Sequence, residues 1–211
     1  MSGLIWKDLM VLRKTLKTYG LFFLFYFLMA AVGLFNISFV TAVLQLIVIM
    51  LPMSAFAYDE QAKWDRYAIA LPLGRRRVVA ARYLFTLLMV LIAAAFSLLT
   101  CTVISIAGNG LFLETLAAVL TTLGLGLLVA DLLLPLNYKL GPERSRPYLY
   151  AIVFLPVIAL VGAAQLGWLD WLDQVPESYV ISLFALAALL PLLGFPVSWL
   201  VSCRIMERKE V

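Results

Sequence analysis

The sequence predicts an all-α integral membrane protein with an N-terminal interfacial helix, six transmembrane helices and both termini in the cytoplasm. Hydrophobic residues make up 64% of the 211 residues and charged residues 13%, against roughly half and one quarter in soluble domains. Six apolar stretches are each long enough to cross a hydrocarbon core, which takes about 20 helical residues. These stretches are residues 20–35, 39–57, 79–107, 111–136, 148–167 and 179–202.

The basic residues lie on only one side of this arrangement. All 16 Lys and Arg residues fall in the two terminal segments or near the connections at 58–78 and 137–147. The alternate connections, near 36–38, 108–110 and 168–178, contain none. Basic residues are retained in the cytoplasm during insertion, so both termini are expected on the cytoplasmic side of a bacterial-type cytoplasmic membrane. The basic residues then serve topology and phospholipid contact, and nucleic acid is the poorer explanation.

Residues 3–17 are expected to form a helix lying in the inner membrane interface. Ile5, Leu9, Leu12 and Leu16 share one helical face, with basic residues spread over the opposite half. A disordered basic tail is the alternative. The whole chain, 1–211, is then a single transmembrane domain, because too few residues remain for a separate globular unit.

The outer connections are predicted to be short, except for the last. Gly108-Asn109-Gly110 is a turn-forming run between the third and fourth spans. Residues 168–178 alternate large apolar and acidic residues before Pro176. This outer loop suits either a short helix dipping into the interface or a span that overshoots into an aromatic belt.

The inner connection at 58–78 is the most informative segment. Residues 60–70 have a helix-compatible composition that ends at Leu71-Pro72. Trp64, Tyr67, Ala68 and Leu71 would form one stripe. Aromatic residues among mixed charges mark interfaces, which favours docking into a partner's cleft. The alternative is that Trp64 and Tyr67 are ordinary interface residues lying on lipid.

The second inner connection, 137–147, is shorter and rich in turn-forming residues. It could make a smaller contact with the same partner, or it could be a solvated basic loop.

Asp131 is the ionisable residue that lies well inside a span. It is four to six residues from the predicted inner end, about 6–9 Å at helical rise. A pair with Arg144, Arg146 or water near the headgroups is the favoured interpretation of this intramembrane polar site, and a proton or substrate site is the other.

Several catalytic patterns are missing from the sequence. The chain has no His, no Gly-x-x-x-x-Gly-Lys-Ser/Thr phosphate loop, no His-Glu-x-x-His and no Gly-x-Ser-x-Gly. Cys101 and Cys203 are expected in different leaflets and make no metal framework. We therefore expect no catalytic, cofactor-binding or metal-binding residues in this chain and no enzyme activity of its own.

The chain closely resembles the permease subunits of small type-2 ABC exporters at Asp59-Glu60-Gln61-x-Lys63-Trp64-Asp65-Arg66-Tyr67-x-x-x-Leu71-Pro72-x-x-Arg75. A second likeness is Pro135-x-x-Tyr138-Lys139-x-Gly141-x-Glu143-x-x-Arg146. The resemblance spans essentially the whole chain and implies the type-2 exporter permease fold.

This resemblance also implies partners. The permease would pair with a second permease, identical or paralogous, and with two separate ATPase subunits that hold ATP and Mg. The first inner connection would be the coupling helix that fits a groove on the ATPase. The implied contact residues are Glu60, Lys63, Trp64, Arg66 and Tyr67, with Tyr138, Lys139, Glu143 and Arg146 in the second inner loop.

The expected function is a permease subunit that couples ATP hydrolysis to export of a hydrophobic or amphipathic substrate, such as a peptide, lipid or drug-like molecule. One alternative is a stand-alone secondary transporter or channel, which needs polar groups converging at mid-membrane. The other is a membrane scaffold or immunity protein that transports nothing.

Overall fold

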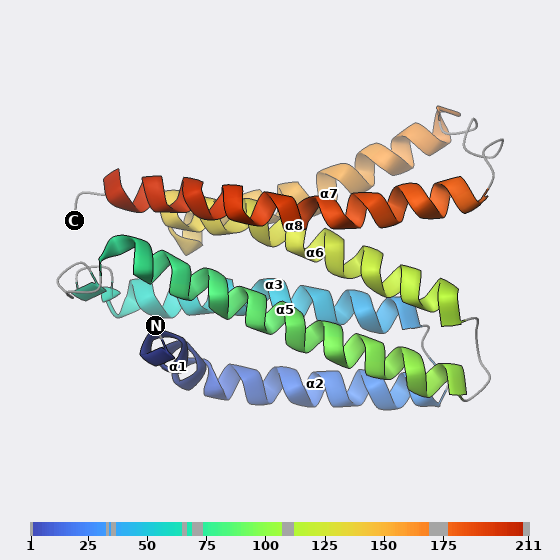
Figure 1. Ribbon diagram of the computed structural model, residues 1–211, viewed down its shortest axis with the longest axis horizontal. Helices are drawn as coiled ribbons and strands as arrows, with labels where there is room; N and C mark the ends of the chain where they lie inside the picture. The colour runs from blue at the N-terminus through green and yellow to red at the C-terminus, as the bar shows by residue number, and fades with distance from the viewer. Residues whose placement is uncertain are drawn as a thin grey trace.

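A computed structural model describes residues 2–32, 34, 37–64, 67–68, 74–106, 112–168 and 177–208. Every element in these ranges is an α-helix, and the long helices run side by side in one bundle (Figure 1). The first helix begins and the last helix ends at the same end of the bundle (Figure 1). We call this the basic end, because the connections predicted to carry Lys and Arg also lie there.

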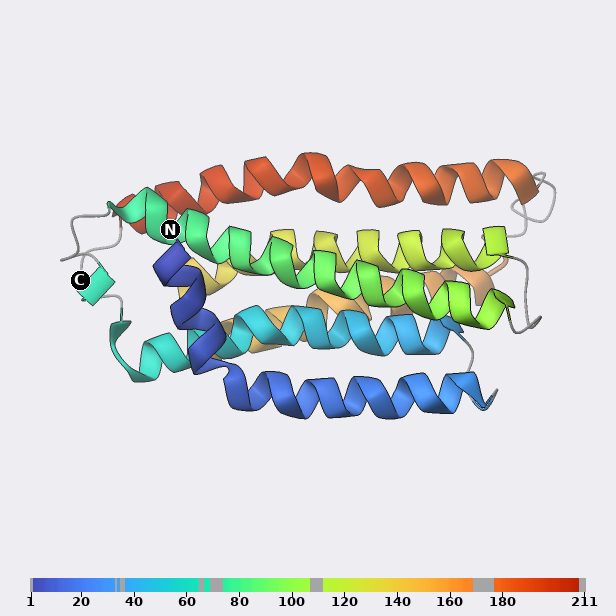
Figure 2. The same ribbon diagram turned by 60° about the horizontal axis from the view of Figure 1, so that its bottom comes forward.

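The first two helices, α1 (Ser2–Val11) and α2 (Arg13–Ala31), are separated at Leu12. Figure 2 shows α1 lying across the bundle near the basic end, whereas α2 runs along it. Ile5, Leu9 and Leu16 pack against the core, and Leu12 is fully buried there. The predicted apolar face therefore packs on protein, and the predicted single helix over 3–17 ends at Val11.

The next helices are α3 (Ile37–Gln61) and α5 (Arg75–Ile106), which enclose the first inner connection. Phe85 and Met89 of α5 pack with Leu51 and Ala55 of α3 in one buried cluster around Leu12. This cluster holds α1, α3 and α5 together.

The last three helices are α6 (Phe112–Leu140), α7 (Pro142–Gln165) and α8 (Glu177–Arg208). The most extensive packing in the bundle is between α6 and α8. In contrast, α7 leaves the bundle along its far half (Figure 1), and nearly all its side chains beyond Val153 are exposed.

Four helices in the described residues are long and apolar enough to cross a membrane, namely α3, α5, α6 and α7. The all-helical membrane character predicted from the sequence is thus confirmed. The count of six spans includes α2 and α8, which are not among those four, and it remains a prediction. The outer turn at 108–110 and most of the outer loop at 168–178 lie outside the described residues.

Candidate functional site

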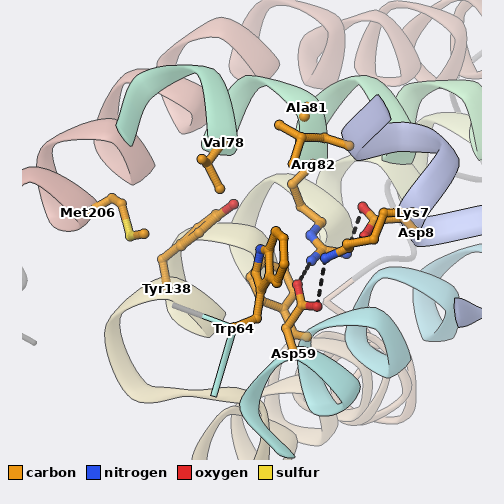
Figure 3. Close-up of a pocket in the computed structure, with 11 residues that line it drawn as sticks. Lys7, Asp8, Asp59, Trp64, Val78, Ala81, Arg82, Tyr138 and Met206 are labelled. Carbon is orange, nitrogen blue, oxygen red and sulfur yellow. Dashed lines mark hydrogen bonds and ion pairs between the residues drawn. The ribbon is translucent and has the colours of Figure 1, made fainter. Parts of the chain in front are cut away.

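Charged side chains from three helices meet at the basic end of the bundle. Arg82 of α5 forms ion pairs with Asp8 of α1, at 3.0 Å, and with Asp59 near the end of α3. Lys7 pairs with the same two carboxylates, at 3.1 Å from Asp8 and 2.7 Å from Asp59. Figure 3 shows these four side chains converging, and we call them the charged cluster.

The charged cluster is largely buried, with Lys7 its most exposed member at 23%, and it carries two positive and two negative charges. The side chains of Arg82 and Asp8 are each 6% exposed, and that of Asp59 is 13% exposed. A buried charge is stable only when it is paired. Here each of the two basic side chains pairs with both carboxylates. The cluster therefore links α1, α3 and α5 where a lone charge would not be tolerated.

Aromatic rings enclose these charges. The Nζ atom of Lys7 lies 4.3 Å from the centre of the Trp64 ring, and the Arg82 guanidinium lies 4.7 Å from the centre of Phe56. Phe56 packs edge-on against Tyr138 of α6 at 4.9 Å between ring centres. Such cation–π contacts gain strength in desolvated positions.

The space among these side chains is too small for a substrate. Its volume is about 20 Å³, room for little more than one water molecule. Among the described side chains, the charged cluster therefore connects helices and leaves no cavity large enough for cargo.

Two further contacts link the start of α5 to the end of α8. Arg75 donates hydrogen bonds to the backbone carbonyls of Met206, at 3.3 Å, and Glu207, at 2.6 Å. Arg76 pairs with the Glu207 carboxylate at 2.6 Å. Carbonyls at the end of a helix have no partner within the helix, so cations there are favourable.

The first inner connection differs from the predicted helix over 60–70. Helix α3 ends at Gln61, and Lys63 adopts a φ of 50°, outside the helical region. The break precedes Trp64, Tyr67 and Ala68, and Leu71 lies outside the described residues, so the predicted stripe stays a prediction. Trp64 is half-buried beside Lys7, Ala68 is 1% exposed and Tyr67 is 65% exposed.

Among the predicted docking residues, Glu60, Lys63 and Tyr67 are exposed, and Trp64 is partly covered by the chain itself. Arg66, together with Asp65 and Leu71, lies outside the described residues.

The second inner connection is a tight turn between helices, where the sequence predicted a loop over 137–147. Helix α6 continues to Leu140 and α7 begins at Pro142, so Gly141 alone separates them. Gly141 has a φ of 82°, and a Cβ there would lie 3.3 Å from Glu60 Oε1. The turn therefore brings the two inner connections into contact.

The predicted contact residues of this turn separate into two groups. Lys139, Glu143 and Arg146 are exposed, whereas Tyr138 is 7% exposed and packs in the core with Phe56. Ser145 is buried and donates to the side chain of Asn137, which fixes the turn from within.

The predicted pairing of Asp131 with Arg144 or Arg146 is wrong. Both arginines lie on the exposed start of α7, and neither carboxylate oxygen of Asp131 has a hydrogen-bond partner in the described residues. The prediction placed the helix end at 136, but α6 ends at Leu140, about 14 Å along the axis from Asp131. The carboxylate instead faces Gly194 of α8, where a Cβ would lie 3.0 Å from Oδ2.

Hydroxyl groups link the helices around this position. The Tyr83 hydroxyl lies 2.7 Å from both Ser198 and Ser202, and Ser198 donates to the backbone carbonyl of Asp131 at 2.6 Å. The chain of contacts joins α5, α8 and α6 through buried polar groups.

Sequence reasoning missed the charged cluster, although one signal pointed to it. Arg82 lies a full turn inside an apolar run, between Ala81 and Tyr83, where an unpaired cation is costly. The acidic residues at the same end, Asp8 and Asp59, were the available partners. No group of three His, Cys, Asp or Glu side chains that could hold a metal occurs among the residues the structure describes.

Four described helices that are long and apolar enough to cross a membrane indicate a multi-pass membrane protein. The chain belongs to the ABC-2 transporter family, because the family model described as ABC-2 family transporter protein matches residues 3–207. It is therefore a permease-type membrane subunit, and the family implies association with an ABC ATPase. Neither the curated proteins nor the solved structures include a match to this chain.

Proposed function

We propose that this chain is the permease subunit of an ATP-driven exporter, and that its first inner connection transmits the motion of a separate ATPase. Six spans with both termini inside would place the basic end in the cytoplasm, where an ATPase is available. ATP and Mg would be held by that partner. A second permease, identical or paralogous, would complete the pathway, and the apolar bundle suits a hydrophobic or amphipathic cargo.

The observation that carries this proposal is the charged cluster. Asp59 lies at the end of α3, directly before the exposed docking residues, and Arg82 connects it to α5. Lys7 and Asp8 extend the connection to α1, and Arg75 extends it from α5 to α8. A displacement of the first inner connection would therefore move four helices together, which is what mechanical coupling to an ATPase requires.

The docking surface itself would be centred on Tyr67. This side chain is 65% exposed at the basic end, and Glu60 and Lys63 are exposed nearby. An exposed tyrosine flanked by charges has the composition of an interface hot spot. Trp64 would support this surface by packing on Lys7, which would hold the first inner connection against α1.

The test is recovery of the ATPase with the tagged chain purified from its native membrane in mild detergent. Tyr67→Ala should lower the recovered ATPase about tenfold, the effect of losing about 1.4 kcal/mol at a hot spot, with the unfolding midpoint of the chain unchanged. Trp64→Ala should lower both quantities, because its ring also packs on Lys7. Tyr148→Ala is the matched control, since Tyr148 is 50% exposed near the same end.

Equal recovery of the ATPase with Tyr67→Ala and with Tyr148→Ala would show that the docking surface lies elsewhere. Recovery of the chain without any ATPase would instead favour a membrane scaffold or a stand-alone transporter. Family membership favours the ATPase-linked permease over both.

A further inference from the structure

A large groove opens between α3 and the first half of α7, before α7 diverges from the bundle. Its volume is about 720 Å³, within the range of roughly 300–1,000 Å³ that ligand sites occupy. Met50 and Met53 line it from α3, and Val153 and Phe154 line it from α7. In a membrane such a space must be filled, because a void forfeits the dispersion contacts of its lining.

The lining changes from polar to apolar along both helices. Toward the basic end it includes Tyr58 and Gln61 of α3 and Arg146 of α7, beside the apolar Ala57 and Pro142. Farther along, it is mostly apolar and includes Ile49 and Met53 of α3 and Phe154 of α7, with Ser54 and Tyr150 as its polar members. The groove is therefore amphipathic, with its charged side chain toward the basic end.

The dimensions of this gradient match one leaflet of a bilayer. From Gln61 to Ile49 the axis of α3 rises about 18 Å, and from Arg146 to Phe154 that of α7 rises about 12 Å. Half of a hydrocarbon core is about 15 Å. A chain that enters beside Arg146 and follows the apolar lining would thus end near the bilayer midplane.

Arg146 gives the groove a positive charge at its polar end. The side chain is exposed and forms no ion pair with any described residue, and no acidic residue lines the groove. Thr15, Tyr58 and Gln61 provide hydroxyl and amide groups near it. A single unpaired guanidinium among neutral polar groups is suited to a phosphate, which it binds through two parallel hydrogen bonds.

We propose that this groove binds one anionic phospholipid of the inner leaflet, with its phosphate at Arg146 and one acyl chain between α3 and α7. The proposal rests on the proposed orientation, in which the basic end faces the cytoplasm. It assigns Arg146 to a lipid, whereas the sequence resemblance implied a contact with the ATPase.

The experiment is native mass spectrometry of the full-length chain, delipidated and then equilibrated with equal amounts of phosphatidylglycerol and phosphatidylcholine. One phosphatidylglycerol per chain should be retained in preference to phosphatidylcholine. Arg146→Gln should weaken this binding about fivefold, the effect of one basic residue near an anionic lipid. Arg144→Gln is the matched control, because Arg144 is exposed on the same helix and does not line the groove.

A second variant tests the apolar part. Val153→Trp should fill the groove and abolish retention of the lipid, with helical content by circular dichroism used to verify folding. If this variant fails to fold, the comparison of Arg146→Gln with Arg144→Gln still decides the matter. Inorganic phosphate alone should neither bind nor compete, since it lacks the acyl chain.

Several results would overturn the assignment. Equal loss with Arg144→Gln and Arg146→Gln would indicate general surface attraction, and equal retention of both lipids would indicate an apolar groove with no headgroup recognition. A dimer without lipid that dissociates in Val153→Trp would show that a second copy covers the groove. Loss of ATPase recovery in Arg146→Gln with unchanged lipid retention would assign Arg146 to the ATPase, independently of the docking role of Tyr67.

Discussion

Arg82 shows most directly how single residues determine the basic end. Its guanidinium is buried between Asp8 and Asp59, and Lys7 balances the remaining charge. Removing one member of a buried ionic group costs far more than the group contributes as a whole, because an uncompensated charge remains in a low-dielectric site. The cluster therefore fixes α1 relative to α3 and α5.

This arrangement predicts a large effect of Arg82→Met. The variant leaves two carboxylates facing Lys7 alone, and we expect the free energy of unfolding to fall by about 3–5 kcal/mol. Chemical denaturation in detergent measures the loss. The further change Asp8→Asn should recover part of it, since one cation and one anion would then remain.

Arg77→Met serves as the control for this prediction, because Arg77 is exposed on the same helix and forms none of the described ion pairs. Equal stability of the Arg77→Met and Arg82→Met variants would mean that the cluster contributes nothing. A double variant no more stable than Arg82→Met alone would contradict the role of charge balance.

At the scale of elements, the approach of α3 to α6 depends on Gly126. A Cβ at this position would lie 1.2 Å from Gln45 Nε2 and 2.4 Å from Gln45 Cγ. Gln45 is 6% exposed, so its side chain has little room to move. The two helices can therefore pack closely only because Gly126 has no side chain, as small residues allow in membrane bundles.

Gly126→Ala should consequently destabilise the bundle by about 1–3 kcal/mol through overpacking. Gly162→Ala is the control, because a Cβ at Gly162 meets nothing within 4 Å and alanine is the better helix former. Adding Gln45→Ala to Gly126→Ala should restore stability by removing the clash. Unfolding midpoints in detergent would test all three, and a harmless Gly126→Ala would show that Gln45 relaxes freely.

The elements also show how far the sequence predicts this structure. Apolar length and the positions of basic residues predicted the helical membrane character, and motif resemblance predicted the family. The break at Leu12 was not predictable, because the apolar period continues through it and only tertiary packing draws Leu12 into the core. The break at Lys63 was not predictable either, because residues 60–70 have a helix-compatible composition.

The candidate site was harder to predict than the fold. The docking residues follow from the family resemblance, and among them the structure leaves Tyr67 exposed and places Trp64 partly buried beside Lys7. The predicted helix end at 136 favoured a pair between Asp131 and Arg144 or Arg146. Helix α6 continues to Leu140, so these arginines lie too far from Asp131 to pair with it. The charged cluster joins residues 8, 59 and 82, and no local pattern reports a contact of that range.

For the whole molecule, the placement of charge predicts the orientation in the membrane. Helix α1 begins and α8 ends at the basic end of the bundle (Figure 1), and α5 begins there at Arg75. The turn after α7, which contains Trp168, lies beyond the opposite end of that helix. Because basic residues are retained in the cytoplasm, we predict that position 77 lies inside and position 168 outside.

Thiol labelling of the chain expressed alone in intact bacteria would test this orientation. A membrane-impermeant maleimide should label Trp168→Cys in intact cells and Arg77→Cys only after permeabilisation, since both positions are exposed. Cys101 is first replaced by Ala, and Cys203 is 4% exposed and should stay unlabelled in both conditions. The reverse pattern would put the basic end outside, away from any cytoplasmic ATPase, and would overturn the proposed coupling together with the orientation.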